Sequence, residues 1–245
     1  MSLTFFYNCK TRLIRNFTNL KQKLNNTNMK TSFLKIFAVV ALISTTSCAD
    51  KAKEAETKEA EAAAVAEAAA INFKVNTDQS MIEWTGYKPT GSHNGVISIS
   101  NGNVQVKDNA IVSGKFTFDM NTITVKDIPM EDEGNGKLAG HLKGADFFDV
   151  ENFPFSKFEI TEITTVDGKT MLSGNLTMKD ATNNISFPVT TEMKDGIMLL
   201  TSETFTIDRS KWNVKYGSKS FFDNLGDKFI NDDIELKVTL AATKA

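Results

Sequence analysis

Two histidines, His93 and His141, are the residues best suited to acid–base or metal chemistry near neutral pH. Neither stands in a metal-binding spacing such as His-Glu-x-x-His, and both cysteines, Cys9 and Cys48, lie well before them in the chain. A metal site made from both histidines and a carboxylate would need the fold to bring them together. Structural histidines at a rim are the simpler interpretation, so we predict no metal site and no cofactor.

Signatures of other catalytic sites are also missing from the sequence. No Gly-x-Ser-x-Gly elbow occurs, and no cysteine nucleophile lies beyond Cys48. The short Gly134-Asn135-Gly136 stretch follows three acidic residues, 131 to 133, that would repel phosphate. We therefore predict that the protein is not an enzyme.

The charge of the chain is unevenly distributed. Residues 1 to 47 carry seven basic residues and no acidic one, so the remainder is more acidic than the overall charge of −2 suggests. An acidic domain repels phosphate backbones, which argues against nucleic acid as a partner. A basic start without acids is typical of a targeting segment.

A signal segment is predicted over residues 1 to 47, with the true start at Met29; a signal peptide with a long n-region that begins at Met1 is the alternative. Lys30 and Lys35 precede a short apolar run, residues 36 to 43, and small residues follow. The run is too short to cross about 30 Å of hydrocarbon as a helix. These features predict an exported protein, periplasmic or at the cell surface.

The residues around Cys48 resemble a bacterial lipoprotein signal, in which the cysteine is lipidated and becomes the new N-terminus. Thr45 departs from the pattern, because a large aliphatic residue is usual there. The resemblance implies lipidation of Cys48 and a membrane anchor. An ordinary secretory signal with an incidental cysteine is the alternative.

Residues 48 to 70 form a tether rich in alanine and glutamate. Alanine, glutamate and lysine favour helix, but no apolar stripe is present to dock the segment on a core. The composition predicts a solvated, partly helical spacer that would hold the following domain on the order of 30 Å from the membrane.

Alternation of apolar and polar residues dominates residues 71 to 245, at 96 to 100, 115 to 120, 185 to 189 and 233 to 240. Strands with one buried and one wet face are typical of antiparallel sheets. Asn101-Gly102, Asp167-Gly168 and Asp195-Gly196 fit tight hairpin turns. The pattern predicts an all-β domain, either a sandwich or a barrel.

Two stretches break the alternation, residues 131 to 153 and 208 to 230. A short helix is expected near Lys137 to Lys143. Each stretch carries a phenylalanine pair, Phe147-Phe148 and Phe221-Phe222, which we expect to pack over a barrel end or over its contents. The chain has 18 Phe against 3 Tyr and 2 Trp, a composition that core filling alone explains well.

Four segments, in order, resemble the YceI-like family of lipid- and polyisoprenoid-binding proteins. They are Ile82-Glu83-Trp84-Thr85-Gly86 with Gly91-Ser92-His93-Asn94-Gly95; His141-Leu142-Lys143 with Asp146-Phe147-Phe148-Asp149-Val150-Glu151-Asn152-Phe153-Pro154; Gly174-Asn175-Leu176-Thr177-Met178-Lys179-Asp180 with Ile185-Ser186-Phe187-Pro188-Val189; and Phe205-Thr206-Ile207-Asp208-Arg209-Ser210-Lys211-Trp212 with Tyr216-Gly217. The second is the most specific. Asp180-Ala181-Thr182 departs from the Gly-x-Thr that is more usual in the family.

The resemblance implies an antiparallel lipocalin-like barrel of about eight strands with a short helical segment. It also implies a long apolar tunnel for a polyisoprenoid, an isoprenoid quinone or a fatty-acyl chain, held by a carrier or reservoir in the cell envelope. A second copy of the chain, as in a homodimer, is left open as a further partner. The alternative is an enzyme that modifies such a lipid through His93 or His141.

The expected ligand-binding residues are apolar and aromatic side chains of these segments and of two alternating strands, with His93, His141 and Arg209 as candidates for meeting a polar head. The full set is Trp84, His93, Ile97, Phe116, Phe118, His141, Phe147, Phe148, Leu176, Phe187, Phe205, Arg209 and Trp212.

Overall fold

Antiparallel strands make up most of the computed structural model, which describes residues 52–65 and 68–245. Met29 and Cys48, with the predictions that rest on them, lie outside these residues. The main strands are β3 (Ile71–Val75), β4 (Met81–Lys88), β5 (Gly91–Lys107), β6 (Ala110–Val125), β7 (Phe155–Val166), β8 (Lys169–Met178), β9 (Ala181–Lys194), β10 (Ile197–Ser202), β11 (Phe205–Asp208) and β12 (Asp233–Lys244).

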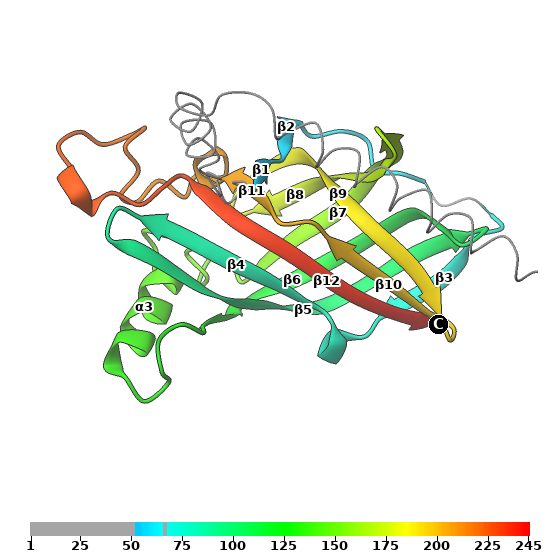
Figure 1. The fold of residues 1–245 in the computed structure, drawn as a ribbon, viewed down its shortest axis with the longest axis horizontal. Coiled ribbons are helices and arrows are strands. Elements are labelled where there is room, and N and C mark those ends of the chain that lie inside the picture. The colour runs from blue at the N-terminus through cyan, green and yellow to red at the C-terminus, as the bar shows by residue number, and fades with distance from the viewer. Residues whose placement is uncertain (1–51, 66–67) are drawn as a thin grey trace, which may run out of the picture. The chain divides into compact units, whose positions relative to one another are not determined.

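The sheet closes on itself through eight of these strands. Each strand pairs with the next in the order β4, β5, β6, β7, β8, β9, β10, β12, and β12 pairs again with β4 (Figure 1). Closure joins Thr239 with Met81 at one end of the β4–β12 ladder and Ile234 with Gly86 at the other. Strand β11 pairs with β12 beyond β10, and β3 pairs with both β5 and β12. The predicted antiparallel barrel is confirmed.

The hairpin turns follow the expected chemistry in two places. Asp167-Gly168 and Asp195-Gly196 both adopt positive φ angles and connect neighbouring strands. The prediction for Asn101-Gly102 is wrong, because these residues lie inside β5 at a register shift. The β5–β6 turn uses Asp108 and Asn109, with φ angles of 50° and 63°, since such short polar side chains tolerate the left-handed region.

One α-helix, α3 (Glu133–Lys143), lies in the first stretch without alternation and confirms the helix expected there. Asp132 caps it by accepting a hydrogen bond from the Gly134 N–H at 2.7 Å, and Leu142 is buried. Short 3₁₀ helices occur at η1 (Thr77–Gln79), η2 (Arg209–Trp212) and η3 (Gly226–Lys228). Within the described ranges, no helix is long and apolar enough to cross a membrane.

The prediction of a helical spacer is wrong for residues 53–59 of the tether, which form two short strands against the barrel. Strand β1 (Lys53–Glu54) runs parallel to β11, and β2 (Glu56–Glu59) is antiparallel to β9. Ala55, between them, is buried, and its N–H donates to the Thr206 carbonyl at 2.8 Å. Backbone hydrogen bonds to β9 and β11 stabilise this segment as strand more than its local preference stabilises it as helix.

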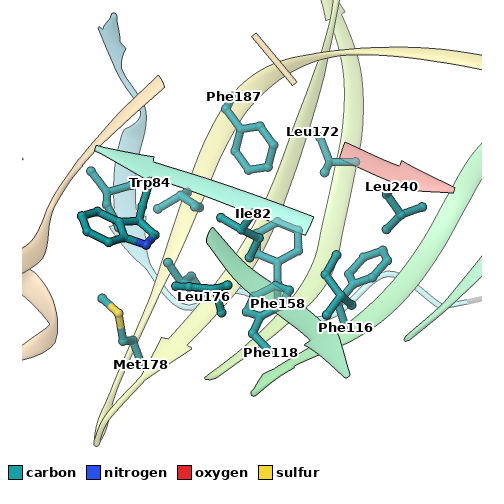
Figure 2. Packing of buried hydrophobic residues seen from close by; sticks show 14 of the residues in the cluster. Ile82, Trp84, Phe116, Phe118, Phe158, Leu172, Leu176, Met178, Phe187 and Leu240 are labelled. Atoms are coloured by element: carbon teal, nitrogen blue, oxygen red, sulfur yellow. The ribbon is translucent and has the colours of Figure 1, made fainter. Parts of the chain in front are cut away.

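Inward-facing side chains from all around the ring fill the barrel (Figure 2). The Phe187 and Phe205 rings stack with centroids 4.2 Å apart, and Phe116 lies 6.3 Å from Phe158. Phe147 and Phe148 are buried, as expected of a pair that covers a barrel end. Phe221 and Phe222 are 49% and 50% exposed, so the same expectation is wrong for them.

Candidate functional site

A cavity of about 270 Å³ occupies one end of the barrel. Its wall comes from strands β4, β5, β6, β8, β11 and β12, helices α3 and η2, and the loops at Phe147 and Ile230. The wall consists of Ile82, Trp84, Gly86, Tyr87, Lys88, His93, Ile97, Phe118, Met120, Ile123, Leu138, His141, Leu142, Phe147, Phe148, Leu176, Met178, Ile207, Arg209, Ile230, Asn231, Ile234 and Leu236. Most of these side chains are apolar, and no Ser, Thr or Cys is among them.

A smaller cavity of about 60 Å³ lies further along the barrel axis. Its wall is entirely apolar: Ile82, Ile99, Phe116, Phe118, Phe158, Leu172, Leu176, Ile185, Phe187, Leu200, Phe205, Leu236, Val238 and Leu240. The two cavities share four residues, which we call the partition: Ile82, Phe118, Leu176 and Leu236. Rotation of these flexible apolar side chains would join the cavities into one longer tunnel.

Polar side chains gather at the outer end of the larger cavity, which we call the mouth. Its residues are partly or fully exposed: Tyr87, Lys88, His93, Leu138, His141 and Asn231. The Tyr87 hydroxyl donates to Glu235 Oε2 at 2.7 Å. Burial, together with this bond and the charge of Glu235, raises the pKa of Tyr87 to about 12, so the phenol stays protonated at neutral pH.

His93 is held at the mouth by Asp127. Its Nδ1 lies 2.8 Å from Asp127 Oδ2, and the Asn94 N–H donates to the other carboxylate oxygen at 2.9 Å. Burial is the largest influence on the pKa of Asp127 and would raise it, but the bonds from Asn94 and His93 together hold that pKa below its ordinary value. An ionised Asp127 only accepts, so Nδ1 carries the hydrogen of this bond.

His141, on α3, packs among aromatic rings at the same mouth. Its ring centroid lies 4.7 Å from that of Tyr216, edge to face, and 5.6 Å from that of Phe147. Its Nδ1 is 3.9 Å from Asp146 Oδ2. The fold thus brings both histidines to one cavity, although they lie 48 positions apart in the chain.

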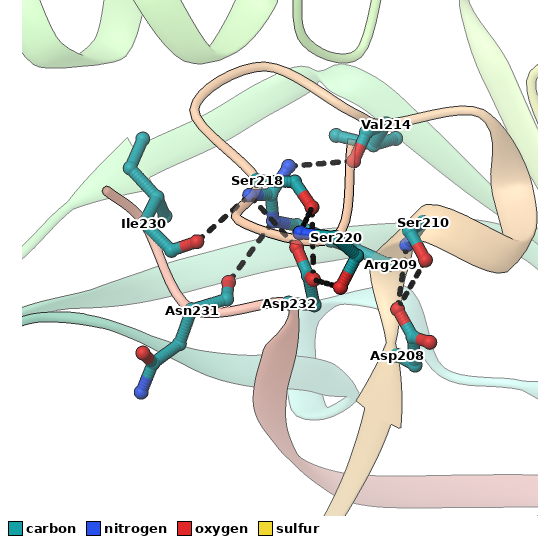
Figure 3. A network of polar contacts seen from close by, with 9 residues as sticks. All are labelled: Asp208, Arg209, Ser210, Val214, Ser218, Ser220, Ile230, Asn231 and Asp232. Carbon is teal, nitrogen blue, oxygen red and sulfur yellow. Dashed lines mark hydrogen bonds and ion pairs between the residues drawn. The ribbon is translucent and has the colours of Figure 1, made fainter. Parts of the chain in front are cut away.

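Arg209 borders the cavity, and its donors are engaged by carbonyls of the loop between η2 and β12 (Figure 3). The fully buried guanidinium donates to the carbonyls of Val214, Ile230 and Asn231 at 2.5, 3.1 and 3.1 Å. It also lies 3.4 Å from Asp232 Oδ1. Burial lowers the pKa of Arg209, and Asp232 opposes that shift. The geometry gives this side chain a structural role.

Of the residues expected to bind a ligand, Trp84, His93, Ile97, His141, Phe147, Phe148 and Arg209 line the larger cavity alone. Phe116, Phe187 and Phe205 line the smaller one, and Phe118 and Leu176 line both. Trp212 lines neither. It is fully buried, and its indole N–H donates to the Leu176 carbonyl at 2.8 Å.

Several lining residues were not expected from the sequence. Met120 follows Phe118 at the two-residue spacing of a strand face, and Leu236 belongs to the alternating stretch 233 to 240, so period two was an available signal for both. Ile230 and Asn231 come from a loop without periodicity, and no sequence signal marked them. Among the described residues, no group of three or more His, Cys, Asp or Glu side chains is placed to hold a metal ion.

The barrel is that of a known protein family. The model of the YceI-like domain matches residues 73–242, and the chain belongs to that family. No curated protein matches the chain significantly.

Solved structures with a similar fold include two with TM-scores above 0.5. One is BcnA of Burkholderia cenocepacia, with 22% identity over 69% of this chain and 99% of that one, and a TM-score of 0.56. The other is a polyisoprenoid-binding domain from Saccharophagus degradans implicated in plant cell wall breakdown, with 10% identity over 71% of this chain and 99% of that one, and a TM-score of 0.51. At identities of 22% and 10%, the similarity to these two proteins shows a shared fold alone.

Proposed function

We propose that the barrel binds one long apolar lipid, a polyisoprenoid, an isoprenoid quinone or a fatty-acyl chain, as a carrier or reservoir in the cell envelope. The observation that carries the proposal is the cavity of about 270 Å³ with apolar walls and a polar mouth, continued by a second apolar cavity behind the partition. Burial at about 25 cal/mol per Å² would bind a long hydrocarbon chain without a specific polar contact. Family membership and the polyisoprenoid-binding neighbour support the same ligand class.

We expect protein extracted gently from its native membrane fraction to carry an isoprenoid or acyl lipid, detected by native mass spectrometry. The variant Ile97→Trp places a large ring in the cavity and should reduce lipid uptake at least tenfold, because it fills the space that the chain needs. Val96→Trp is the matched control, since Val96 is the neighbour on the other face of β5 and lines neither cavity. Unliganded wild-type protein that also takes up neither added quinone nor fatty acid would refute the proposal.

An enzyme acting on the lipid is the second candidate, favoured by the His93–Asp127 pair at the mouth. That pair could activate water, although the cavity wall offers no hydroxyl or thiol nucleophile besides the phenol of Tyr87. The double variant His93→Ala with His141→Ala separates the two functions. A carrier keeps most of its lipid affinity in this variant, whereas an enzyme loses its turnover.

We further propose that Cys48 carries the lipid anchor, which would keep the barrel close to the membrane. Residues 53–59 pair with the barrel wall, so only residues 49–52 separate Cys48 from Lys53. At about 3.6 Å per extended residue, the two Cα atoms are at most about 18 Å apart. The barrel would then sit near the bilayer rather than on a long spacer.

We expect Cys48→Ser to move the protein from the membrane fraction to the soluble fraction, because it removes the acyl attachment site. Mass spectrometry of the wild-type N-terminal peptide should reveal the acyl chains on Cys48. An unmodified Cys48 in membrane-extracted protein would contradict the anchor and leave the lipid cavity untouched.

A further inference from the structure

The indole N–H of Trp84 is a polar group in the cavity wall, and the binding of an apolar chain does not explain it. Trp84 is only 8% exposed, lines the larger cavity, and its Nε1 has no hydrogen-bond partner. Among buried side-chain polar atoms of the described residues, only Asp232 Oδ1 shares this condition, and the Arg209 guanidinium compensates that oxygen at 3.4 Å. A buried donor without an acceptor costs on the order of 1–3 kcal/mol.

The second tryptophan shows that this fold readily satisfies an indole. Trp212 is fully buried, and its N–H donates to the Leu176 carbonyl. Trp84 instead has no such acceptor: in the view of Figure 2 its nitrogen lies on the ring edge toward Leu176 and Met178, both cavity residues, and not even the weakly accepting sulfur of Met178 bonds to it. The donor is therefore placed where a ligand atom, rather than a protein atom, is its natural partner.

The depth of Trp84 restricts which part of a ligand can reach it. On β4 it stands two residues from Gly86, near the mouth, and two residues from Ile82, in the partition. At about 3.4 Å per residue, the Cα atom of Trp84 lies on the order of 7 Å from that of each. A head group that stayed at the mouth would leave the N–H facing hydrocarbon.

The charges nearby favour an uncharged acceptor. Arg209 is the one cation buried in the cavity wall, and its guanidinium is already engaged by three carbonyls and Asp232. An anionic phosphate at this depth would lack a free cation and would pay a large desolvation cost. A carbonyl or ether oxygen has a much smaller desolvation cost, and it can accept one hydrogen bond from the indole N–H.

We propose that Trp84 is a polar recognition residue inside the cavity, and that the bound lipid places an uncharged oxygen acceptor at its indole N–H, below the mouth. The proposal rests on the proposed function, since it requires a ligand in this cavity. It makes the protein selective for a lipid with a carbonyl or ether oxygen near one end over a pure hydrocarbon of equal length.

Two probes test this, hexadecane and methyl hexadecanoate, which differ by an ester group on a similar chain. Wild-type protein should bind the ester about tenfold tighter. In Trp84→Phe, which keeps an aromatic ring but lacks the donor, the ratio of ester affinity to hexadecane affinity should fall about tenfold. A preference for the ester that survives unchanged in Trp84→Phe overturns the proposal.

Nuclear magnetic resonance of the wild-type protein gives a test that needs no variant. The chain has 2 Trp, so labelled tryptophan yields two indole N–H signals, and that of Trp212 serves as the internal reference. The Trp84 proton should move downfield with the ester and not with hexadecane. Equal responses to both probes overturn this inference alone. If neither probe binds, both this inference and the proposed function are contradicted.

Discussion

Replacing Gly95 by alanine is expected to destabilise the barrel by about 3 kcal/mol or more. A Cβ atom at this position would lie 1.7 Å from the Thr124 carbonyl oxygen and 2.8 Å from Cζ2 of Trp84. The first contact is with backbone of the neighbouring strand β6, which cannot move away without breaking its ladder with β5. We expect either a strongly lowered midpoint in urea denaturation or no folded protein.

The matched control is Gly86→Ala on the paired strand β4. A Cβ at Gly86 meets no atom within 4 Å, so this variant should stay within about 1 kcal/mol of the wild-type stability. Both glycines lie in the same β4–β5 ladder, which isolates the steric effect from the general cost of changing a glycine. Equal stability of the two variants would contradict this account of Gly95.

Gly95 also connects stability with the cavity. Because it has no side chain, the Trp84 ring can lie against β5 where the two residues pair. His93 and Gly95, two residues apart on β5, therefore have separate structural roles. Gly95 makes room for the indole inside the barrel, and His93 holds Asp127 at the mouth.

Much of this architecture could be predicted because it depends on local periodicity. Alternation placed Phe116 and Phe118 on the inward face, and both line cavities. Asp167-Gly168 and Asp195-Gly196 succeeded as turns because positive φ angles are a local requirement. These features need no knowledge of distant parts of the chain.

Two of the failures share a different cause, because in each a tertiary contact decides the structure. Residues 53–59 have a helical composition but pair with β9 and β11, which are more than a hundred positions away. Gly102 follows Asn101 as in a hairpin turn, yet it lies in a strand where a Cβ would come within 2.8 Å of the Phe116 ring. Periodicity and turn preference carry no information about such partners.

Arg209 is the residue for which the interpretation changes most. As a cation in a family-like segment it was a candidate for meeting a polar head, but its guanidinium is bound to carbonyls on both sides of one loop. Its ionic partner Asp232 lies 23 positions later and belongs to no recognisable motif. Asp232 is itself held by the hydroxyls of Ser218 and Ser220 at 2.8 and 2.7 Å.

We accordingly expect Arg209→Met to lower the free energy of unfolding by about 3–5 kcal/mol, because it leaves three carbonyls without a donor and Asp232 without its counter-ion. Arg209→Lys keeps the charge but not the planar fork, so it should recover only part of this loss. Lys211→Met, on a partly exposed neighbour, is the control and should change stability by less than about 1 kcal/mol. Urea denaturation measures all three, and hydrogen exchange should show residues 213–232 opening first in the methionine variant. A methionine variant that keeps wild-type stability but loses lipid affinity would instead assign Arg209 to the head group.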